Sequence, residues 1–367
     1  MTDQVDAIII GGGIVGLAVA RALAMAGREA LVLEAEARLA SHASARNSEV
    51  VHAGLYYPTG SNKARLCVAG KALLYDYAAR HQVAHRRIGK YIVATNGDEE
   101  AALHALARQA ESNGVADLCW ADKARLRDEE PALHAVAALF SPSTGIIDSH
   151  GFALALEGDI ADHGGLIARN CRFARAAATG RGFAVRAAET SLSCRWLVNA
   201  AGLWAETVAR SIDGLARARI PKQHLAKGHY AALTGGAAPF RHLIYPLPDA
   251  VGLGIHATLD IGGQCRFGPD SGEWLERIDY GFTMARLATF YPAVRRYWPG
   301  LPDGALAPGY SGIRARLAGP GAPPGDFLIE GPAQHGLAGF INLMGIESPG
   351  LTAALAIAEE VKAMMAA

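Results

Sequence analysis

Three glycines near the start of the chain have the spacing that binds phosphate groups. A G-x-G-x-x-G pattern places Gly11, Gly13 and Gly16 in one loop. In this pattern the first glycine allows a tight turn, the second lets a pyrophosphate approach the backbone, and the third lets the next helix pack closely. Ile14 and Val15 lie within this pattern, just before a predicted helix whose N-terminus favours negative charge. The chemistry that these residues predict is the binding of a dinucleotide.

The surrounding residues predict the βαβ unit that this pattern requires. Residues 7–10 form a β-branched run typical of a strand buried on both faces, and residues 17–26 form an alanine-rich helix. A second strand at 30–33 ends at Glu34, about 20 residues beyond the first glycine. Glu34 and the adjoining Ala35 are expected beside the ribose, where the carboxylate disfavours a 2′-phosphate and so NADP. FAD and NAD remain open at this point.

A polar loop then follows. Ser44, Arg46, Asn47 and Ser48 carry hydroxyl, guanidinium and amide groups within five positions. Such groups can bind many acceptor oxygens at once, so they suit phosphate and ribityl contacts. The alternative is a solvated turn.

Longer segments add a resemblance. The stretch at 41–58, SHASARNSEVVHAGLYYP, is similar to the segment that runs from the pyrophosphate to the flavin ring in the D-amino-acid-oxidase-like superfamily of FAD oxidoreductases. Within it, the chain looks most like L-2-hydroxyglutarate dehydrogenase and its relatives. Segments 197–204 (LVNAAGLW) and 345–352 (GIESPGLT) resemble the same family. The likeness is weakest at 98–134 and 274–303, and it implies FAD as the cofactor.

The resemblance implies further FAD contacts. Small residues let backbone approach a ligand, and a Pro-Gly turn that opens a helix presents free N–H groups to negative charge on the reduced flavin. A weaker match, at 168–173, resembles the edge strand that holds adenine. The alternatives are a plain capping turn and an ordinary short strand. The residues expected at the cofactor in these segments are Arg172, Phe173, Ala200, Gly202, Trp204, Gly345, Glu347, Ser348, Pro349, Gly350, Leu351 and Thr352.

Oxidation of a 2-hydroxy acid needs a cation for the carboxylate and a base for the hydroxyl proton while a hydride moves to flavin N5. Arg314 resembles the Gly-x-Arg position that grips a carboxylate in this superfamily, the alternative being a surface salt bridge. The resemblance puts His52 beside the flavin as proton acceptor, with a structural histidine as the alternative. Tyr245 and His256 are expected to share the proton transfer or bind the carboxylate. Lys227 is expected to supply charge for a second carboxylate.

The composition limits the partners. Lys plus Arg and Asp plus Glu both number 35, so no surplus positive charge attracts nucleic acid, although a local basic groove is left open. Five cysteines without a C-x-x-C pair predict free thiols in the cytoplasm and no metal site. The apolar stretch at 7–26 lacks a basic flank, and no uncharged run reaches the ~20 residues of a membrane span. We expect a cytoplasmic protein, with peripheral contact to the inner membrane left open.

The expected fold class is α/β, with a Rossmann-type FAD-binding domain interleaved with an α+β substrate domain built on an antiparallel sheet. In the substrate domain, we expect a strand at 89–95, an amphipathic helix at 98–113 with Glu99 outward, and roof strands at 242–246 and 252–256. The FAD-binding parts are expected at 1–85, 146–218 and 325–367, and the substrate parts at 86–145 and 219–324.

The leading hypothesis is oxidation of a 2-hydroxy acid such as L-2-hydroxyglutarate, with electrons passed to an external acceptor, for example a quinone or oxygen. An amine or amino-acid oxidase and a flavin-binding module without catalysis are the alternatives. Gly252-Leu-Gly254 lacks the third glycine of a second dinucleotide pattern, so we expect electrons to enter from the substrate. Glu49 occupies a position where the family predicts a small residue, and its carboxylate leaves the pocket charge open.

Overall fold

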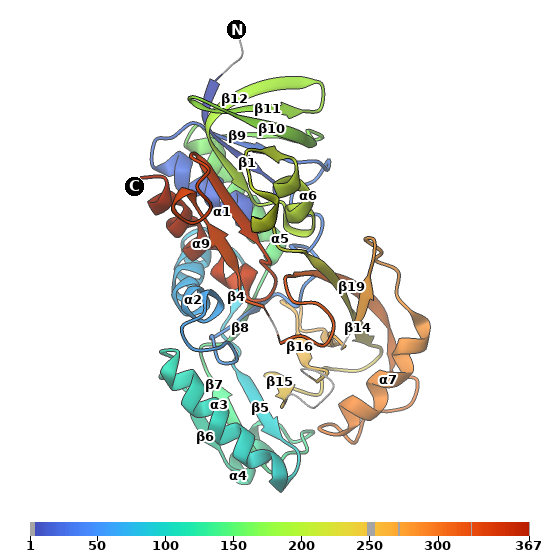
Figure 1. The fold of residues 1–367 in the computed structure, drawn as a ribbon. Helices are drawn as coiled ribbons and strands as arrows, with labels where there is room; N and C mark the ends of the chain where they lie inside the picture. Colours follow the sequence, from blue (N-terminus) through green and yellow to red (C-terminus); the bar gives the residue numbers. More distant parts are fainter. Residues whose placement is uncertain (1–3, 248–253, 271, 324, 367) are drawn as a thin grey trace.

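Two large β-sheets, one in the upper and one in the lower half of Figure 1, organise the chain. The computed structural model describes residues 4–247, 254–270, 272–323 and 325–366. Residues on one strand of the first sheet alternate between two cores, because successive side chains of a strand point to opposite faces. Ala7 and Ile9 enter one core and Ile8 and Ile10 the other, so the predicted burial on both faces is confirmed.

The first sheet is mostly parallel at its centre, where β1 pairs with β2 and β12, and β2 pairs with β9. Its order is β13-β10-β11-β12-β1-β2-β9, with β21 beside β12 and β20 beside β21. The strands are β1 (Gln4–Ile10), β2 (Ala30–Leu33), β9 (Leu166–Ala168), β10 (Phe173–Thr179), β11 (Gly182–Ala187), β12 (Thr190–Asn199), β13 (Ile212–Asp213), β20 (Leu328–Glu330) and β21 (Phe340–Met344).

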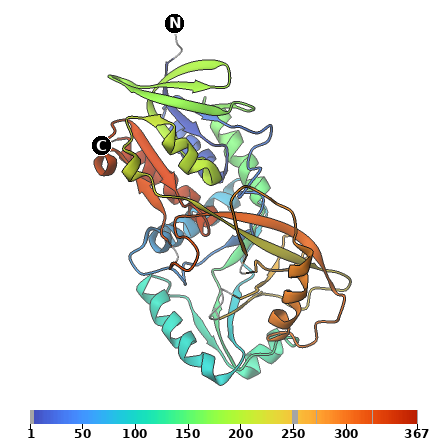
Figure 2. The ribbon, with the colours of Figure 1, turned by 45° about the vertical axis from the view of Figure 1, so that its right-hand side comes forward.

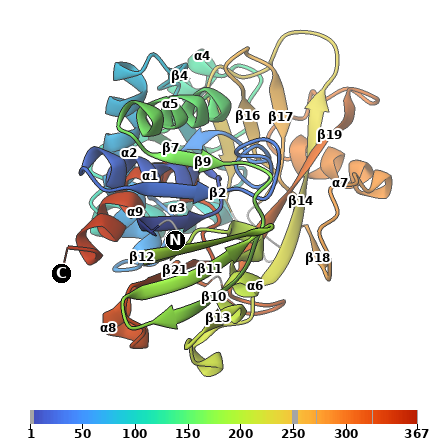
Figure 3. The ribbon, with the colours of Figure 1, turned by 90° about the horizontal axis from the view of Figure 1, so that it is seen from above.

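A group of apolar helices covers one face of this sheet (Figure 3). Helix α9 packs against α1 and α2, and α1 also packs against α5. The alanine-rich sequences of α1 and α9 allow this close approach, because small side chains bring helix axes together. The helices are α1 (Ile14–Met25), α2 (Asn62–Arg80), α5 (Ser149–Asp162) and α9 (Gly350–Met364), with α6 (Ala205–Arg210) and α8 (Pro332–His335) packing elsewhere on the sheet.

The second sheet is mostly antiparallel and contains a long pair, β14 and β19, that runs across the molecule in Figure 2. Its one parallel pairing among the described residues joins β5 to β15. The strands are β5 (Lys90–Ala94), β6 (Cys119–Ala121), β7 (Ala137–Ser141), β14 (His224–Leu233), β15 (Leu243–Pro246), β16 (Ala257–Leu259), β17 (Cys265–Phe267), β18 (Glu273–Leu275) and β19 (Leu306–Arg316).

Shorter elements complete the fold. A small sheet in the order β3-β8-β4 lies at the junction of the two halves. Its strands are β3 (Val50–Val51), β4 (His85–Arg86) and β8 (Gly145–Ile147), the remaining helices are α3 (Glu100–Ser112), α4 (Lys123–Glu129) and α7 (Met284–Arg295), and the 3-10 turns are Gly97–Glu99, Gly202–Trp204 and Arg217–Arg219.

The chain alternates between the two large sheets as the expected fold class requires, and that fold class is confirmed. Strands from 86–145 and 219–324 enter the second sheet or the small one, whereas β9 to β13, β20 and β21 return to the first. The domain limits themselves stay predictions. In the part of the chain that the structure describes, no helix is both long and apolar enough to cross a membrane.

Three local predictions need correction. The single strand expected at 168–173 is two strands, β9 and β10, joined by a turn in which Asn170 has φ 54°. Of the strand expected at 252–256, the first two residues lie outside the described residues, and the strand begins only at Ala257. Glu99 is half-buried instead of outward, because its carboxylate accepts a 2.7 Å hydrogen bond from the Thr95 amide and pairs with Arg296 at 2.6 Å.

Candidate active site

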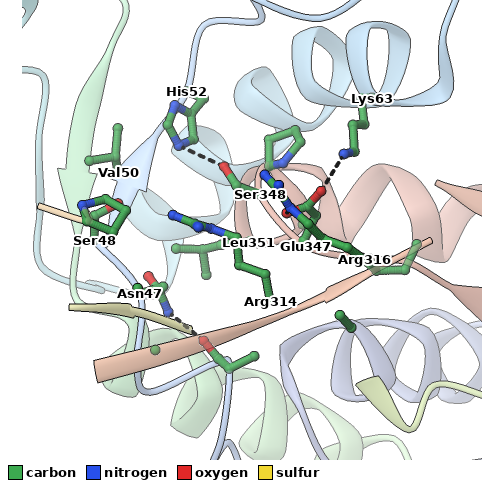
Figure 4. A pocket seen from close by; sticks show the side chains of 18 of the residues that line it. Asn47, Ser48, Val50, His52, Lys63, Arg314, Arg316, Glu347, Ser348 and Leu351 are labelled. Carbon is green, nitrogen blue, oxygen red and sulfur yellow. Dashed lines mark hydrogen bonds and ion pairs between the residues drawn. The ribbon is translucent and has the colours of Figure 1, made fainter. Parts of the chain in front are cut away.

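A cavity of about 510 Å³ lies between the two large sheets, and Figure 4 shows side chains that line it. Segments from both ends of the chain meet here: the start of α1, the loop before β3, strands β14, β15 and β19, and the loop before α9. Many residues singled out from the sequence share this wall. They are Ile14, Val15, Ser44, Arg46, Asn47, Ser48, His52, Gly202, Tyr245, His256, Arg314, Glu347, Ser348, Pro349, Gly350 and Leu351.

The glycine loop is packed so tightly that side chains would not fit. A Cβ on Gly16 would lie 2.0 Å from the Gly11 carbonyl oxygen, and one on Gly11, which has φ 108°, would lie 2.6 Å from the Ala200 oxygen. Small Ala200 therefore lets β12 approach the loop, and it does not itself line the cavity. Gly13, the second glycine of the pattern, is the N-cap residue of α1 and provides no side-chain cap.

Two helices begin at the cavity wall. Helix α1 starts at Ile14, whose N–H donates to Ser44 Oγ at 3.1 Å, and α9 starts at Gly350 after Pro349, which provides no side-chain cap. The first N–H groups of a helix lack partners inside the helix, and they stabilise negative charge. Two such ends at one cavity fit a ligand that carries a diphosphate and a second electron-rich group, as FAD does.

Glu34 braces the glycine loop. Its Oε2 accepts a hydrogen bond from the Gly12 amide and its Oε1 one from the Glu36 amide, both at 2.7 Å. Each carboxylate oxygen keeps a further lone pair, so contact with ribose hydroxyls remains the prediction for Glu34. Nearby, Arg172 pairs with Glu36 at 3.3 Å and Phe173 packs on an apolar core, so neither lines the cavity.

The Gly16→Ala variant is expected to purify without FAD and with a melting temperature several degrees lower, on the order of a 1–3 kcal/mol loss in the free energy of unfolding. The added methyl group forces α1 away from the loop because of the 2.0 Å clash. Flavin absorbance and differential scanning fluorimetry measure both effects. Gly158→Ala is the matched control, since Gly158 lies on α5 with no atom within 4 Å of its added Cβ. Full FAD occupancy in Gly16→Ala would contradict the prediction.

The polar loop uses part of its hydrogen-bonding capacity internally. The Asn47 amide donates to the Ala43 and Ser44 oxygens at 3.1 and 2.7 Å and accepts from the Glu49 amide at 2.8 Å. Arg46 lies over the Tyr280 ring, 4.2 Å from its centroid. These contacts hold the loop together, and Asn47 supports its shape rather than offering a free amide.

Glu49 is turned away from the cavity. Its φ of 56° lies in the left-handed region, which explains why a small residue, commonly glycine, is expected at this position. Its Oε1 accepts hydrogen bonds from the Ser149 amide and hydroxyl at 3.1 and 2.8 Å, and Arg266 lies 3.8 Å from Oε2. Glu49 therefore lies outside the cavity lining, with its carboxylate bound by Ser149 and close to Arg266.

His52 is fixed from several sides at the cavity wall. Its amide donates to Thr352 Oγ1 at 3.0 Å, the Cys67 thiol donates to its carbonyl at 3.4 Å, and its Nε2 lies 3.3 Å from Ser348 Oγ (Figure 4). Burial, followed by the charges of Lys90 and His256, lowers the pKa of His52 to about 3. The imidazole is thus neutral at physiological pH and has an unprotonated nitrogen, while burial makes it a weaker base than free imidazole.

Arg314 reaches into the cavity from β19 (Figure 4). Its two terminal nitrogens lie over Gly228, where an added Cβ would be 3.6 Å from each. Within the described residues this guanidinium forms no hydrogen bond or ion pair. The nearby carboxylate, Glu347, is bound instead by Lys63 at 2.9 Å and Arg316 at 3.2 Å. The arrangement leaves Arg314 as a cation available to an anionic substrate.

The charge of Glu347 is stabilised by these cations. Burial alone would raise the pKa of Glu347, but Lys63, Arg316 and Arg314 together hold it below its ordinary value. The carboxylate therefore stays ionised and neutralises Lys63 and Arg316. Its predicted direct contact with FAD stays a prediction, because both oxygens already bind cations within the protein.

Tyr245 and His256 lie stacked at the cavity, with ring centroids 3.6 Å apart. Burial holds the pKa of Tyr245 well above its ordinary value, so its hydroxyl stays protonated and can donate a hydrogen bond. Both residues line the cavity, Tyr245 from β15 and His256 from just before β16, and their roles stay predictions.

Lys227 is not placed as expected. Gly228 and Tyr230 of β14 line the cavity, and Lys227 points to the opposite face because strand side chains alternate. There its ammonium group donates to Asp279 at 3.1 Å and to the Gly281 oxygen at 2.9 Å. Lys227 is therefore not at the cavity, and the prediction that it contacts a second substrate carboxylate is wrong.

The remaining predicted residues lie behind the wall. Trp204 packs edge-on against His42 at 4.6 Å, Gly345 turns the chain with φ 66°, and Thr352 is buried as the hydrogen-bond partner of His52. Ala35 follows β2 in a bend away from the cavity lining. These residues shape the site through the backbone.

Sequence reasoning missed several side chains at or next to the cavity. Tyr56 lies inside the quoted loop segment but received no role, and Tyr230 stacks on Tyr310 at 4.5 Å. Lys63 and Lys90 are buried lysines. Lys90 begins an otherwise apolar strand. The sequence shows this pattern, which is unusual because a lysine is almost never fully buried unless it is paired.

Known proteins resemble this chain in sequence and in fold. The chain belongs to the DAO family of FAD-dependent oxidoreductases, whose family model matches residues 6–364. FAD is therefore its cofactor, and the protein is an oxidoreductase rather than a flavin-binding module without catalysis. It is 40% identical to the mitochondrial L-2-hydroxyglutarate dehydrogenase of Arabidopsis thaliana, over 98% of this chain and 83% of that protein.

Solved structures share the fold. The FAD-bound L-α-glycerophosphate oxidase of Mycoplasma pneumoniae superposes with a TM-score of 0.88 at 22% identity, covering 100% of this chain and 95% of that one. Glycine oxidase from Geobacillus kaustophilus gives a TM-score of 0.83 at 18% identity, covering 100% and 95%. At these identities the likeness concerns the fold alone.

Proposed function

We propose that the protein oxidises a small 2-hydroxy acid, L-2-hydroxyglutarate or a close analogue, to the 2-oxo acid. The observation that carries the proposal is the placement of two groups on the walls of one cavity: Arg314, a cation without an ion pair in the part of the chain that the structure describes, and His52, a neutral imidazole. The similarity to a plant L-2-hydroxyglutarate dehydrogenase supports the choice of substrate class.

Each residue has a distinct task in this reaction. When bound, FAD supplies the acceptor for the hydride that leaves the substrate carbon, at flavin N5. Arg314 binds the substrate carboxylate through paired N–H groups and so orients the carbon–hydrogen bond. His52 accepts the hydroxyl proton on its imidazole; its backbone amide is held by Thr352, and its ring contacts Ser348. We propose that the electrons then pass to an external acceptor such as a quinone or oxygen.

An anaerobic titration of the FAD-loaded protein tests this function. L-2-hydroxyglutarate is expected to bleach the flavin absorption band stoichiometrically, and L-glutamate and glycine are expected to leave it unchanged. L-2-hydroxyglutarate and L-glutamate differ only in the hydroxyl or amino group on the reacting carbon, so this pair separates carbon–oxygen from carbon–nitrogen oxidation. Bleaching by the amino acids alone would favour the amine-oxidase alternative, and bleaching by neither would reject the proposal.

A further inference from the structure

Two polar groups next to the cavity have no hydrogen-bond partner among the described residues. The Lys90 side chain is 0% exposed, and its Nζ contacts no acceptor in the described part of the chain. The Tyr56 hydroxyl is also buried and without a partner there. Unsatisfied buried donors are rare in folded proteins, because each loses its bonds to water without replacement.

The two groups belong to one piece of wall. Lys90 Nζ lies 4.8 Å from the centroid of the Tyr56 ring and 4.5 Å from that of the Tyr245 ring. Both rings line the cavity, and Tyr245 stacks on His256. The ammonium group is thus held by the faces of two aromatic rings on the far side of the wall from the open space.

The groups around Lys90 do not neutralise it. Burial raises the pKa of the Cys67 thiol to about 12 and that of the Tyr56 and Tyr245 hydroxyls well above their ordinary values. His52 is neutral, since burial, Lys90 and His256 lower its pKa. No carboxylate within the described residues pairs with Lys90, and burial lowers the pKa of Lys90 to about 7. A bound anion would therefore stabilise the positive charge of Lys90, which burial disfavours.

We propose that Tyr56 and Lys90 form a second anion subsite, which receives the distal carboxylate of a dicarboxylic 2-hydroxy acid while Arg314 holds the first. The Tyr56 hydroxyl donates to that carboxylate. Lys90, which is enclosed behind the rings, acts as a positioning residue: it supplies positive charge through the low-dielectric wall and orients Tyr56 by its ring contact. This inference rests on the proposed function and replaces Lys227 as the source of charge for the second carboxylate.

A matched pair of substrates tests the subsite. L-2-hydroxyglutarate and L-2-hydroxyvalerate have the same carbon chain and differ in a terminal carboxylate or methyl group. Lys90→Met is expected to lower kcat/KM for the dicarboxylic acid by about 10- to 100-fold, mainly through KM, and to leave the monocarboxylic acid within about twofold. Tyr56→Phe should act in the same direction by about tenfold. Lys71→Met, which removes a nearby lysine bonded to Ser143 at 2.8 Å, is the control.

Two further readouts separate a charge effect from a merely structural one. In the unmodified holoenzyme, KM for L-2-hydroxyglutarate should rise as pH increases through about 7, because Lys90 loses its charge there; Lys90→Met should lose this dependence. Binding of 2-oxoglutarate to the oxidised holoenzyme, followed by the shift of the flavin spectrum, should weaken in Lys90→Met, and binding of 2-oxovalerate should not.

The outcomes distinguish the two proposals. If the unmodified enzyme oxidises neither hydroxy acid, the proposed function fails and the subsite with it. If it oxidises both equally well, or if Lys90→Met lowers both alike, the subsite is overturned while 2-hydroxy-acid oxidation stands. Should Lys90→Met fail to fold or to hold FAD, Tyr56→Phe with the same substrate pair decides, since it removes only the hydroxyl.

Discussion

His52→Gln is expected to lower kcat by about 10²- to 10⁴-fold, the range for the loss of a positioned general base. Glutamine keeps a polar group near Ser348 but cannot take the substrate's hydroxyl proton. Because the pKa of His52 is lowered to about 3, its proton-accepting form is fully present at pH 5–8 and is lost only as pH falls toward 3. The unmodified enzyme should therefore show no loss of kcat/KM from protonation of His52 across that range.

Stopped-flow reduction of the flavin under anaerobic conditions measures this step directly. His163→Gln is the control, because His163 is exposed at the end of α5 and bonds only within that helix. FAD content should match the unmodified protein, since the contact between position 52 and Thr352 uses the backbone amide. A His52→Gln enzyme that reduces its flavin at the normal rate would assign the proton to another acceptor.

Arg314→Ala is expected to lower kcat/KM by about 10²- to 10³-fold, chiefly through KM, because the substrate carboxylate loses its paired donors. Arg314→Lys should recover only part of this loss, since an ammonium group cannot make the paired contact. Steady-state kinetics with L-2-hydroxyglutarate and L-2-hydroxyvalerate should show the same fractional loss, because both carry the first carboxylate.

The stability of this variant gives a second measurement. Arg314 forms no bond within the described residues, so its removal should change the melting temperature by no more than about 2 °C. Arg108→Ala, at an exposed position of α3, provides the comparison. If Arg314→Ala kept its KM, the carboxylate would have to bind elsewhere in the cavity.

Local patterns with strong geometric requirements were predictable from the sequence. The glycine loop, β1, α1 and β2 follow from spacing and buried runs, and β2 matches its predicted limits of 30–33. The roof strand β15 was likewise expected. The expected strand, 242–246, starts one residue before the observed one. These predictions succeed because the chain near each feature dictates its own conformation.

Contacts between distant segments were not predictable in this way. The side-chain alternation of β14 points Lys227 away from the cavity. Glu49 has a left-handed φ, and its own side chain points away from the cavity. Sequence showed a lysine at position 90 but not the two rings that enclose it. The pairing of Glu347 with Lys63 joins residues 284 positions apart, a separation that no local pattern reports.

The position of α9 also bears on how the protein is made. This segment supplies one of the two helix ends at the cavity and packs between α1 and α2, although it comes from the last part of the sequence. During translation the glycine loop emerges first, yet its binding site stays incomplete until residues 350–364 have left the ribosome. Capture of FAD is therefore expected to require a folded α9, and a nonsense mutation upstream of α9 should yield a polypeptide without flavin.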